Sequence, residues 1–296
     1  MDIFYKGKKP ELDMPYFGRQ SRFFDFFYKC IEPLLEKDGV YAETNSGSVS
    51  NAYMFAKKGY KVITNDVSLY SYAIAKTVIS DSNISSVKKT GNWIDNYTND
   101  YKSIAALFAS LIENYGYNPK VPEELNEKLK KSIDYYTKHL TLIKEKGVKA
   151  KRIYNEDLFD FLNILEKEKI KVDVMFMDFA WPWRDGTKTE EYDTTANVFS
   201  DILGQKNKDI VIWDNNNIIA NVIRAIKAAQ KVSKYVLLSN QSSNYPTPEI
   251  LEVALLKNNI NYDIRHTMTT DSEYEDNLGK ENYFREYLYV IKGTIE

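Results

Sequence analysis

The stretch VDVMFMDFAWPWRDG, residues 172–186, places an acid and two tryptophans directly after an apolar run. The run has the composition of a buried strand, so Asp178 is expected at the strand tip. Phe179, Ala180 and Trp181 follow where the chain must turn. A carboxylate and a backbone carbonyl accept hydrogen bonds, and an aromatic ring stacks on another flat ring. The stretch is therefore a candidate site for holding a flat polar molecule by its N–H groups.

Other polar residues stand where further strands are expected to end. Asn45 and Gly47 lie in a turn of small residues after one apolar run, Asp66 ends a second run, and Asp157 follows a third. In an open α/β sheet, ligands bind outside the carboxyl ends of the strands, near the point where the strand order reverses. Together these residues predict a nucleoside cofactor site followed by a reaction site. Asp157 taken singly is more typical of a helix N-cap.

The first 80 residues alternate between helical and extended periods, and this alternation must position the candidate site. Helices are expected at 21–36, 49–58 and 69–79, and strands at 40–43 and 60–66. Strand, turn, helix, strand and helix within about 40 residues are typical of a doubly wound parallel sheet.

The alternation stops at residue 80 and resumes at residue 150. Residues 80–149 are polar, lysine-rich and mostly helical in period, which predicts an inserted helical subdomain. Residues 1–79 and 150–296 then form the α/β domain. Its later elements are expected to be a strand and a helix within 151–165, a strand at 172–178, a candidate strand at 209–215, a helix at 218–232, a strand at 234–240, and an antiparallel pair within 261–270 and 284–293.

Composition limits the partners that the chain can attract. Hydrophobic residues make up 43% of the chain, which is enough for a sizeable core. The net charge is −2, so any polyanion must be held by a local basic patch. Two lysine-rich runs are the candidates, although such runs are more often a solvated face. They contribute Lys128, Lys130, Lys131, Lys149, Lys151 and Arg152.

Cysteine and histidine are too scarce for a disulfide framework or a typical zinc site. The chain has one cysteine, Cys30, and two histidines, His139 and His266, so no metal site is expected. Cys30 has helical spacing among apolar neighbours, as a core thiol does. No apolar run reaches 18 residues and no signal-peptide pattern is present, so we expect a cytoplasmic protein with no membrane partner.

The motifs of the α/β segments occur in a characteristic order. Residues 48–79, SVSNAYMFAKKGYKVITNDVSLYSYAIAKTVI, strongly resemble the first βαβα unit of adenine-specific DNA methyltransferases that use S-adenosylmethionine (SAM). YNEDLFDFL resembles that family's element beside the cofactor adenine. VDVMFMDFAW stands where the family has D-P-P-Y, and KYVLLSNQSS and REYLYVIKG are similar to its later strands.

The resemblance implies an α/β, Rossmann-like methyltransferase fold with a mostly parallel sheet closed by an antiparallel strand pair. In this order of motifs the helical insert at 80–149 becomes the expected target-recognition subdomain. The implied cofactor is SAM and the implied partner is double-stranded DNA. A restriction-modification or phage system is the implied setting, with a second methyltransferase or restriction subunit as a further partner.

The resemblance also assigns roles to residues. Asp178 and the carbonyl of Phe179 or Ala180 would hold the adenine amino group by its two N–H bonds. Trp181 would stack on the base after it is flipped out of the duplex. The residues expected to bind the cofactor are Tyr16, Gly18, Arg19, Asn45, Gly47, Asp66 and Asp157.

The sequence departs from the family at its most diagnostic motifs. F-x-G-x-G reads ETNSG here, from Glu43 to Gly47, and D-P-P-Y reads DFAW, without either proline. Asn45 reaches left-handed dihedrals more readily than most residues, so the turn is expected to persist. Gly18-Arg19-Gln20 stands where the family has glycine, serine and lysine, and Arg19 supplies a positive charge.

These departures leave two interpretations. The first is an active DNA adenine-N6 methyltransferase. The second is a catalytically degenerate methyltransferase-like subunit that binds DNA or a partner protein. The exocyclic nitrogen of cytosine stays an alternative target, whereas methylation of the cytosine ring carbon is not expected because the chain has no Pro-Cys pair.

Overall fold

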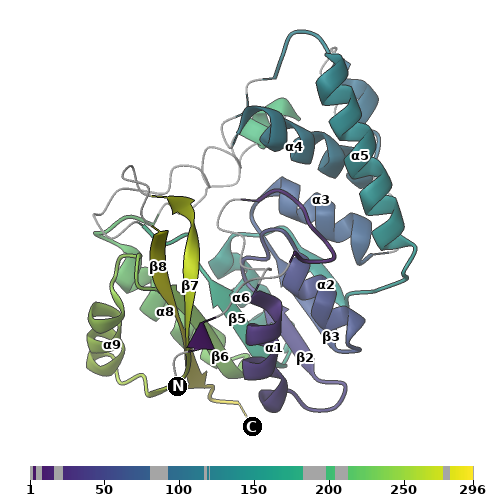
Figure 1. Ribbon diagram of the computed structural model, residues 1–296. Helices are drawn as coiled ribbons and strands as arrows, with labels where there is room; N and C mark the ends of the chain where they lie inside the picture. The colour runs from purple at the N-terminus through teal and green to yellow at the C-terminus, as the bar shows by residue number, and fades with distance from the viewer. Residues whose placement is uncertain are drawn as a thin grey trace.

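The sheet runs through the centre of the protein, and its strand order reverses once (Figure 1). The computed structural model describes residues 3–4, 9–16, 23–80, 93–116, 119, 121–182, 198–203, 213–275 and 281–295, with the backbone alone at 3–4, 264–275 and 281–284. The eight strands lie in the order β4 (Arg152–Tyr154), β3 (Lys61–Asn65), β2 (Val40–Glu43), β5 (Val172–Asp178), β6 (Ser233–Gln241), β8 (Glu281–Lys292), β7 (Tyr262–Glu275) and β1 (Ile3–Phe4).

Strands β4, β3, β2, β5 and β6 are parallel, and β8 is antiparallel to both β6 and β7. From β2 the chain builds outward through β3 to β4, and then crosses back to place β5 on the other side of β2. The switch point therefore lies between β2 and β5, where an open α/β sheet places its ligand. The α/β class, the mostly parallel sheet and the closing antiparallel pair are confirmed.

Helices cover both faces of the sheet. α1 (Phe24–Ile31), α2 (Ser50–Lys57) and α3 (Leu69–Val78) share a buried cluster with one face, through strand residues such as Tyr41 and Phe176. α6 (Leu158–Lys167), α8 (Ile218–Gln230) and α9 (Pro248–Lys257) pack on the other face, against residues such as Met175 and Met177. The two sets of residues alternate along β5, as the period of a strand requires.

Residues 93–150 extend the first core cluster and do not form a separate core. α4 (Tyr101–Tyr115) is buried continuously from Ile104 to Ile112, and α5 (Glu127–Lys144) covers it. Phe108 of α4 stacks on Phe199, with ring centroids 3.9 Å apart, and meets Tyr70 of α3 edge-on. The insert is thus a helical layer built onto α3, above the carboxyl edge of the sheet in Figure 1.

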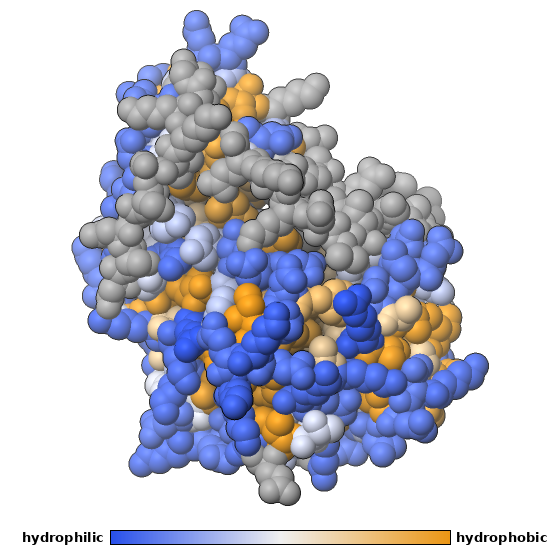
Figure 2. All heavy atoms as spheres, turned by 180° about the vertical axis from the view of Figure 1, so that it is seen from behind, coloured by the Kyte–Doolittle hydropathy of each residue, from blue (hydrophilic) through white to orange (hydrophobic). Residues whose placement is uncertain are grey.

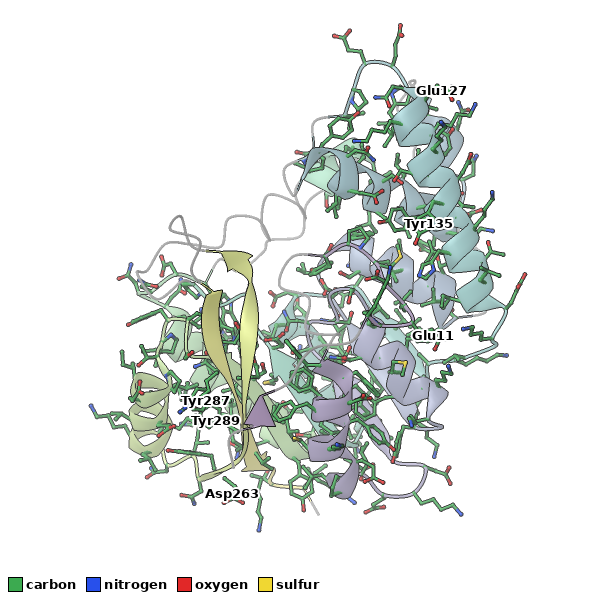
Figure 3. The ribbon with its side chains drawn as sticks, viewed as in Figure 1. Glu11, Glu127, Tyr135, Asp263, Tyr287 and Tyr289 are labelled. Carbon is green, nitrogen blue, oxygen red and sulfur yellow. The ribbon has the colours of Figure 1, made fainter. Side chains whose placement is uncertain are left out.

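The segment from residue 9 to 16 is fastened across α2 and α3. The Ser50 hydroxyl donates to the Leu12 carbonyl at 2.6 Å, and the Tyr70 hydroxyl donates to the Pro15 carbonyl at 3.0 Å. Glu11, labelled in Figure 3, pairs with Lys57 of α2 and with Lys146, which follows α5. These contacts place the following residue, Tyr16, at the carboxyl edge.

Several element boundaries differ from the sequence predictions. The helix expected at 21–36 is α1 followed by a 3-10 turn, η2 (Glu32–Leu34), because Pro33 cannot continue an α-helix. A second 3-10 turn, η3 (Trp93–Tyr97), precedes α4. The expected strand at 209–215 is not formed over residues 213–215, and the rest of it lies outside the described residues. α9 was not predicted.

Across the described ranges, no helix has the length and apolar character needed to span a bilayer.

Candidate functional site

Polar side chains form one row across the carboxyl edge of the sheet, all on the face covered by α1, α2 and α3. Glu43 pairs in register with Thr64 on β3 and with Phe176 on β5. Asp66 and Asp178 lie two residues beyond these partners, so they point to the same face as Glu43. The row continues through Ser239, which pairs with Asp178, and Glu286 on β8. We call Glu43, Asp66, Asp178, Ser239 and Glu286 the polar row.

A glycine turn joins the end of β2 to α2 beside this row. Gly47 has φ +50°, and its N–H donates to Asp66 Oδ2 at 2.8 Å. A Cβ on Gly47 would lie 3.2 Å from Cε1 of Tyr16, so the ring of Tyr16 lies directly over the turn. Val49 at the start of α2 has φ +64°, which is strained for a β-branched residue. Strain of this kind is typical of ligand-binding turns.

Asp66 holds this turn to the start of α3. Its second oxygen, Oδ1, accepts the N–H of Ser68 at 2.8 Å. Burial raises the pKa of Asp66 to about 6, while hydrogen bonds from the backbone of Ser68 and Gly47 and from the Ser71 hydroxyl lower it. Each carboxylate oxygen has two lone pairs, so Asp66 retains acceptor sites for a ligand hydroxyl.

Two asparagines tie neighbouring strand ends together. The side-chain amide of Asn65 donates to the carbonyls of Thr44 and Glu156, each at 3.0 Å, and its oxygen accepts the N–H of Glu156. Asn155 donates to the carbonyls of Asp66 and Val67. These bonds fix the loops after β2, β3 and β4 relative to one another, so the carboxyl edge is preorganised.

Glu43 is buried beneath α2, with 2% of its surface exposed. Its Oε1 accepts the hydroxyl of Tyr41 at 2.7 Å, whereas its Oε2 is buried with no hydrogen-bond partner among the described residues. Burial raises the pKa of Glu43 to about 8; the Tyr41 hydrogen bond lowers it, and the charges of Asp178 and Asp66 raise it further. Glu43 is therefore mostly protonated at neutral pH.

Asp178 is half-buried at the tip of β5, as expected from the sequence. Burial raises its pKa to about 7, and a hydrogen bond with the Ser239 side chain lowers it. The Ser239 hydroxyl also donates to Glu286 through a short hydrogen bond. A hydroxyl has one proton, so Ser239 cannot donate to both acids at once. While it donates to Glu286, a carboxylate at Asp178 keeps its acceptor sites for another N–H group.

The structure places Trp181 on the opposite side of the sheet from Asp178, which differs from the expectation of an accessible stacking ring. Its side chain is 6% exposed, and its Nε1 donates to the carbonyl of Ser239 at 3.1 Å. The ring packs edge-on against Phe179 within the second core cluster. In this conformation the indole has no free face for a base. Ala180 lies between Phe179 and Trp181 in the sequence, and Trp183 lies outside the described residues.

The aromatic rings that are half-exposed near this strand end are Phe159 and Trp213. Trp213 lies 4.6 Å from the ring of Phe179 and 6.5 Å from that of Phe159, in a stacked orientation to the latter. The guanidinium of Arg224 lies 3.9 Å from the centre of the Phe159 ring. These residues come from α6, α8 and the loop before α8, and sequence analysis did not predict their meeting.

The remaining expected cofactor residues have mixed outcomes. Asp157 is the N-cap of α6, because its side chain accepts the N–H of Phe159 at 2.8 Å. Asn45 is exposed, and the positive φ angles of the turn fall at Gly47 and Val49, so Asn45 does not supply the left-handed position. Gly18 and Arg19 lie outside the described residues.

Two other sequence expectations concern charge and cysteine. Arg152 of the basic runs pairs with Glu168 and Tyr154, so its charge is partly neutralised. Cys30 is a buried free thiol whose pKa burial raises to about 12. No group of three or more metal-ligating side chains meets within the part of the chain that the structure describes.

Sequence analysis missed Ser239 and Glu286. Both belong to strands that were predicted, but neither was chosen as a site residue. Glu286 carries a signal that could have been used, because it is an acid directly before the aromatic and aliphatic run YLYVI of a predicted strand. A charged residue in a fully buried strand position usually needs a partner and a reason.

No family model and no curated protein sequence matches the chain. Solved structures give faint likenesses. Magnesium protoporphyrin IX methyltransferase from Synechocystis PCC 6803, with bound SAM, has 10% identity and a TM-score of 0.38 over 91% of this chain and 78% of that chain. A SAM dependent methyltransferase from Agrobacterium tumefaciens has 9% identity and a TM-score of 0.41 over 92% and 61%. A methyltransferase-like protein complexed with S-adenosylhomocysteine (SAH) has 8% identity and a TM-score of 0.39 over 85% of this chain, which spans 44% of that protein.

Proposed function

We propose that this chain is a SAM-dependent methyltransferase that acts on the exocyclic N6 of adenine in double-stranded DNA. The observation that carries the proposal is the meeting of three groups at one switch point. The Gly47 turn, Asp66 and Asp178 come from three neighbouring strands and share one face of the sheet. The Gly47 turn and Asp66 can therefore bind a nucleoside cofactor next to Asp178, which can bind the reacting amino group.

The residues present fit the cofactor. Gly47 leaves open the space that a Cβ would fill beside Tyr16, and its backbone is held by Asp66. Asp66, after β3, keeps acceptor sites for ribose hydroxyls, and Asp157 stands at the start of α6, after the adjacent strand β4. SAM supplies an electrophilic methyl group on a sulfonium. Tyr16, one of the residues that the resemblance expects to bind the cofactor, lies over the turn.

Asp178 is proposed to hold the amino group that becomes methylated. The nitrogen lone pair of adenine N6 is delocalised into the ring, so the site gains most by orienting the group. One N–H would donate to the Asp178 carboxylate and the other to the carbonyl of Phe179 or Ala180. The ionised form of Asp178 offers both carboxylate oxygens as acceptors for this N–H group.

DNA as the substrate rests on the resemblance. Trp213 and Phe159 have rings that are partly open to solvent, but they pack against the second core cluster, as Trp181 does, on the side of the sheet opposite Asp178. The proposal therefore assigns no base-stacking ring among the described residues. A restriction-modification or phage setting, with a second subunit, remains part of this proposal.

A second candidate is a non-catalytic subunit that binds DNA or a partner protein. Two observations favour it: the burial of Trp181, and an apolar stripe on α9. Ile250, Val253 and Leu256 are 40%, 51% and 58% exposed and follow one another at helical spacing. Figure 2 shows orange spheres gathered at the right, on the side where α9 lies. A stripe of this kind is typical of a protein contact surface.

The test is transfer of a labelled methyl group from SAM to adenine-containing duplexes of mixed sequence. The wild type is expected to label adenine N6, and Asp178→Ala, which removes the acceptor, is expected to lose transfer by at least about a hundredfold, as for other lost transition-state donors and acceptors. Asp160→Ala is the matched control, since Asp160 is an exposed acid on α6. If the wild type transfers nothing with or without candidate partner subunits, the second candidate takes over.

A further inference from the structure

Three of the four acids of the polar row, Glu43, Asp66 and Asp178, lie at the ends of neighbouring strands without a counter-ion. Glu43 and Asp66 are 2% and 5% exposed, and Asp178 is half-buried between them and Ser239. Among the described residues, no lysine or arginine is one of the groups that act on the pKa of any of the three. Neighbouring strands lie about 4.8 Å apart, so these carboxyl groups are close enough to repel one another when ionised.

The unpaired oxygen of the buried Glu43 carboxyl group is a second indication of a ligand at this edge. Its Oε2 is buried with no hydrogen-bond partner among the described residues, and the same holds for Oγ1 of Thr64, its register partner on β3. A buried polar atom left unpaired costs about 1–3 kcal/mol, which is unusual in a preorganised site. The three acids are not arranged as a metal site, since no such group exists in the described residues. A diffuse organic cation fits the arrangement better.

We propose that Glu43, Asp66 and Asp178 form one acidic cluster that distinguishes SAM from its product SAH by charge. Binding of the cationic sulfonium of SAM releases a proton from the cluster. Binding of SAH, whose thioether is neutral, releases no proton. The inference rests on the proposed function and adds a role for Glu43 that no motif of the sequence assigns. Glu43 acts as a positioning residue: it holds the proton in the ligand-free protein and supplies negative charge when the sulfonium is bound. On methyl transfer the bond between sulfur and the methyl carbon breaks, the bond between nitrogen and that carbon forms, and the methylated amino group loses one proton. With the sulfonium charge gone, the cluster takes up a proton again, which favours product release.

The groups that surround Glu43 are consistent with this role. Tyr41 on its own strand donates to Oε1, and Asp178 and Asp66 act on it from β5 and β3. α2, which covers it, contributes the backbone of Ala52 and no charged side chain to its electrostatics. The N-terminal segment contributes Tyr16, whose own pKa burial and the charges of Asp66 and Asp178 raise. The near neighbours are therefore acids and phenols, and a bound cation is the group that would lower the pKa of Glu43.

The test is calorimetric titration of the full chain with SAM and with SAH, at pH 7.0, in phosphate and in Tris. The difference in observed enthalpy between the two buffers measures the protons released. SAM binding is expected to release about one proton, and SAH binding close to none. SAM affinity should also rise from pH 6 to pH 8, while SAH affinity changes less than about twofold. Equal proton release by the two ligands overturns the proposal while leaving the proposed function standing; no binding of either ligand overturns both.

The substitution Glu43→Gln separates the contribution of Glu43 to proton release from that of Asp66 and Asp178. Glutamine keeps the volume and the acceptor for the Tyr41 hydroxyl but cannot titrate. Its proton release on SAM binding should fall by at least half, and its preference for SAM over SAH should shrink. Glu166→Gln is the control, because Glu166 is a half-exposed partner of Lys231 on the outside of α6. If Glu43→Gln releases as many protons on SAM binding as the wild type does, the role of Glu43 is contradicted. The comparison of SAM with SAH in the wild type does not depend on whether this variant folds.

Discussion

At the scale of single residues, the structure supports the predicted place of Asp178 and changes that of Trp181. Asp178 lies at the strand tip, as its place after the apolar run predicted, with acceptor sites for an incoming group. Trp181 follows three residues later but lies in the core with its N–H bonded to Ser239. Sequence spacing placed both residues near the edge. It could not tell which side of the sheet each would face, because that depends on how the loop turns after β5.

Trp181→Ala is expected to destabilise the fold by about 3–5 kcal/mol, the usual range for removing a buried aromatic side chain. Trp181→Phe keeps most of the volume and removes the bond to the Ser239 carbonyl, so its loss should be nearer about 1 kcal/mol. The measurement is urea denaturation of both variants. Normal stability combined with weakened DNA binding would instead restore Trp181 as an accessible stacking ring.

At the scale of elements, the turns after the strands decide the site. The period of the sequence predicted β2, β3, β5 and β6 to within a few residues, because buried strands carry nearly continuous apolar runs. The bonds that fix those strand ends were not predictable, since the Asn65 amide reaches Glu156 across 91 positions of sequence. The turn after β2 persisted as expected, but through Gly47 and Val49 and not through Asn45.

Gly47→Ala tests whether that turn is a cofactor cradle. Alanine at φ +50° costs about 1–2 kcal/mol in backbone strain and brings a methyl group to 3.2 Å from the ring of Tyr16. Gly59→Ala is the matched control: Gly59 also has positive φ, but nothing lies within 4 Å of its added Cβ. Both variants should lose similar stability. Only Gly47→Ala should lose SAM affinity, by at least about tenfold in a calorimetric titration; equal losses would reduce the turn to a structural role.

At the scale of the whole molecule, the acids of the polar row should give the ligand-free protein an unusual pH dependence. The pKa of Glu43 is raised to about 8 and that of Asp178 to about 7, so the folded state binds more protons than the unfolded state below these values. The free energy of unfolding must therefore fall as pH rises through this range. His139, whose pKa is lowered from 6.5, opposes the trend only below that pH.

Between pH 6.5 and 8 the free energy of unfolding should fall by about 1–2 kcal/mol, measured by urea denaturation without ligand. Glu43→Gln should flatten most of this slope, because the group with the highest raised pKa is removed. Saturating SAM should flatten it in the wild type as well, since a bound cation stabilises the ionised acids. If the free energy of unfolding of the wild type stayed constant or rose over this pH range, the acids of the cluster would be ionised at every pH tested, with their charges compensated by other groups.

The most direct test of the central claim, that the carboxyl edge of this sheet is a SAM site, is the binding of SAM to the full-length wild-type chain by isothermal titration calorimetry at pH 7.5. One SAM per chain is expected, with micromolar affinity or better, and Asp66→Ala should weaken it by at least about tenfold, because two hydrogen bonds to a charged group are lost. Asp134→Ala, at an exposed acid on α5, should bind as the wild type does. If millimolar SAM gave no heat of binding with a protein shown to be folded, the claim that this edge of the sheet is a SAM site would be contradicted.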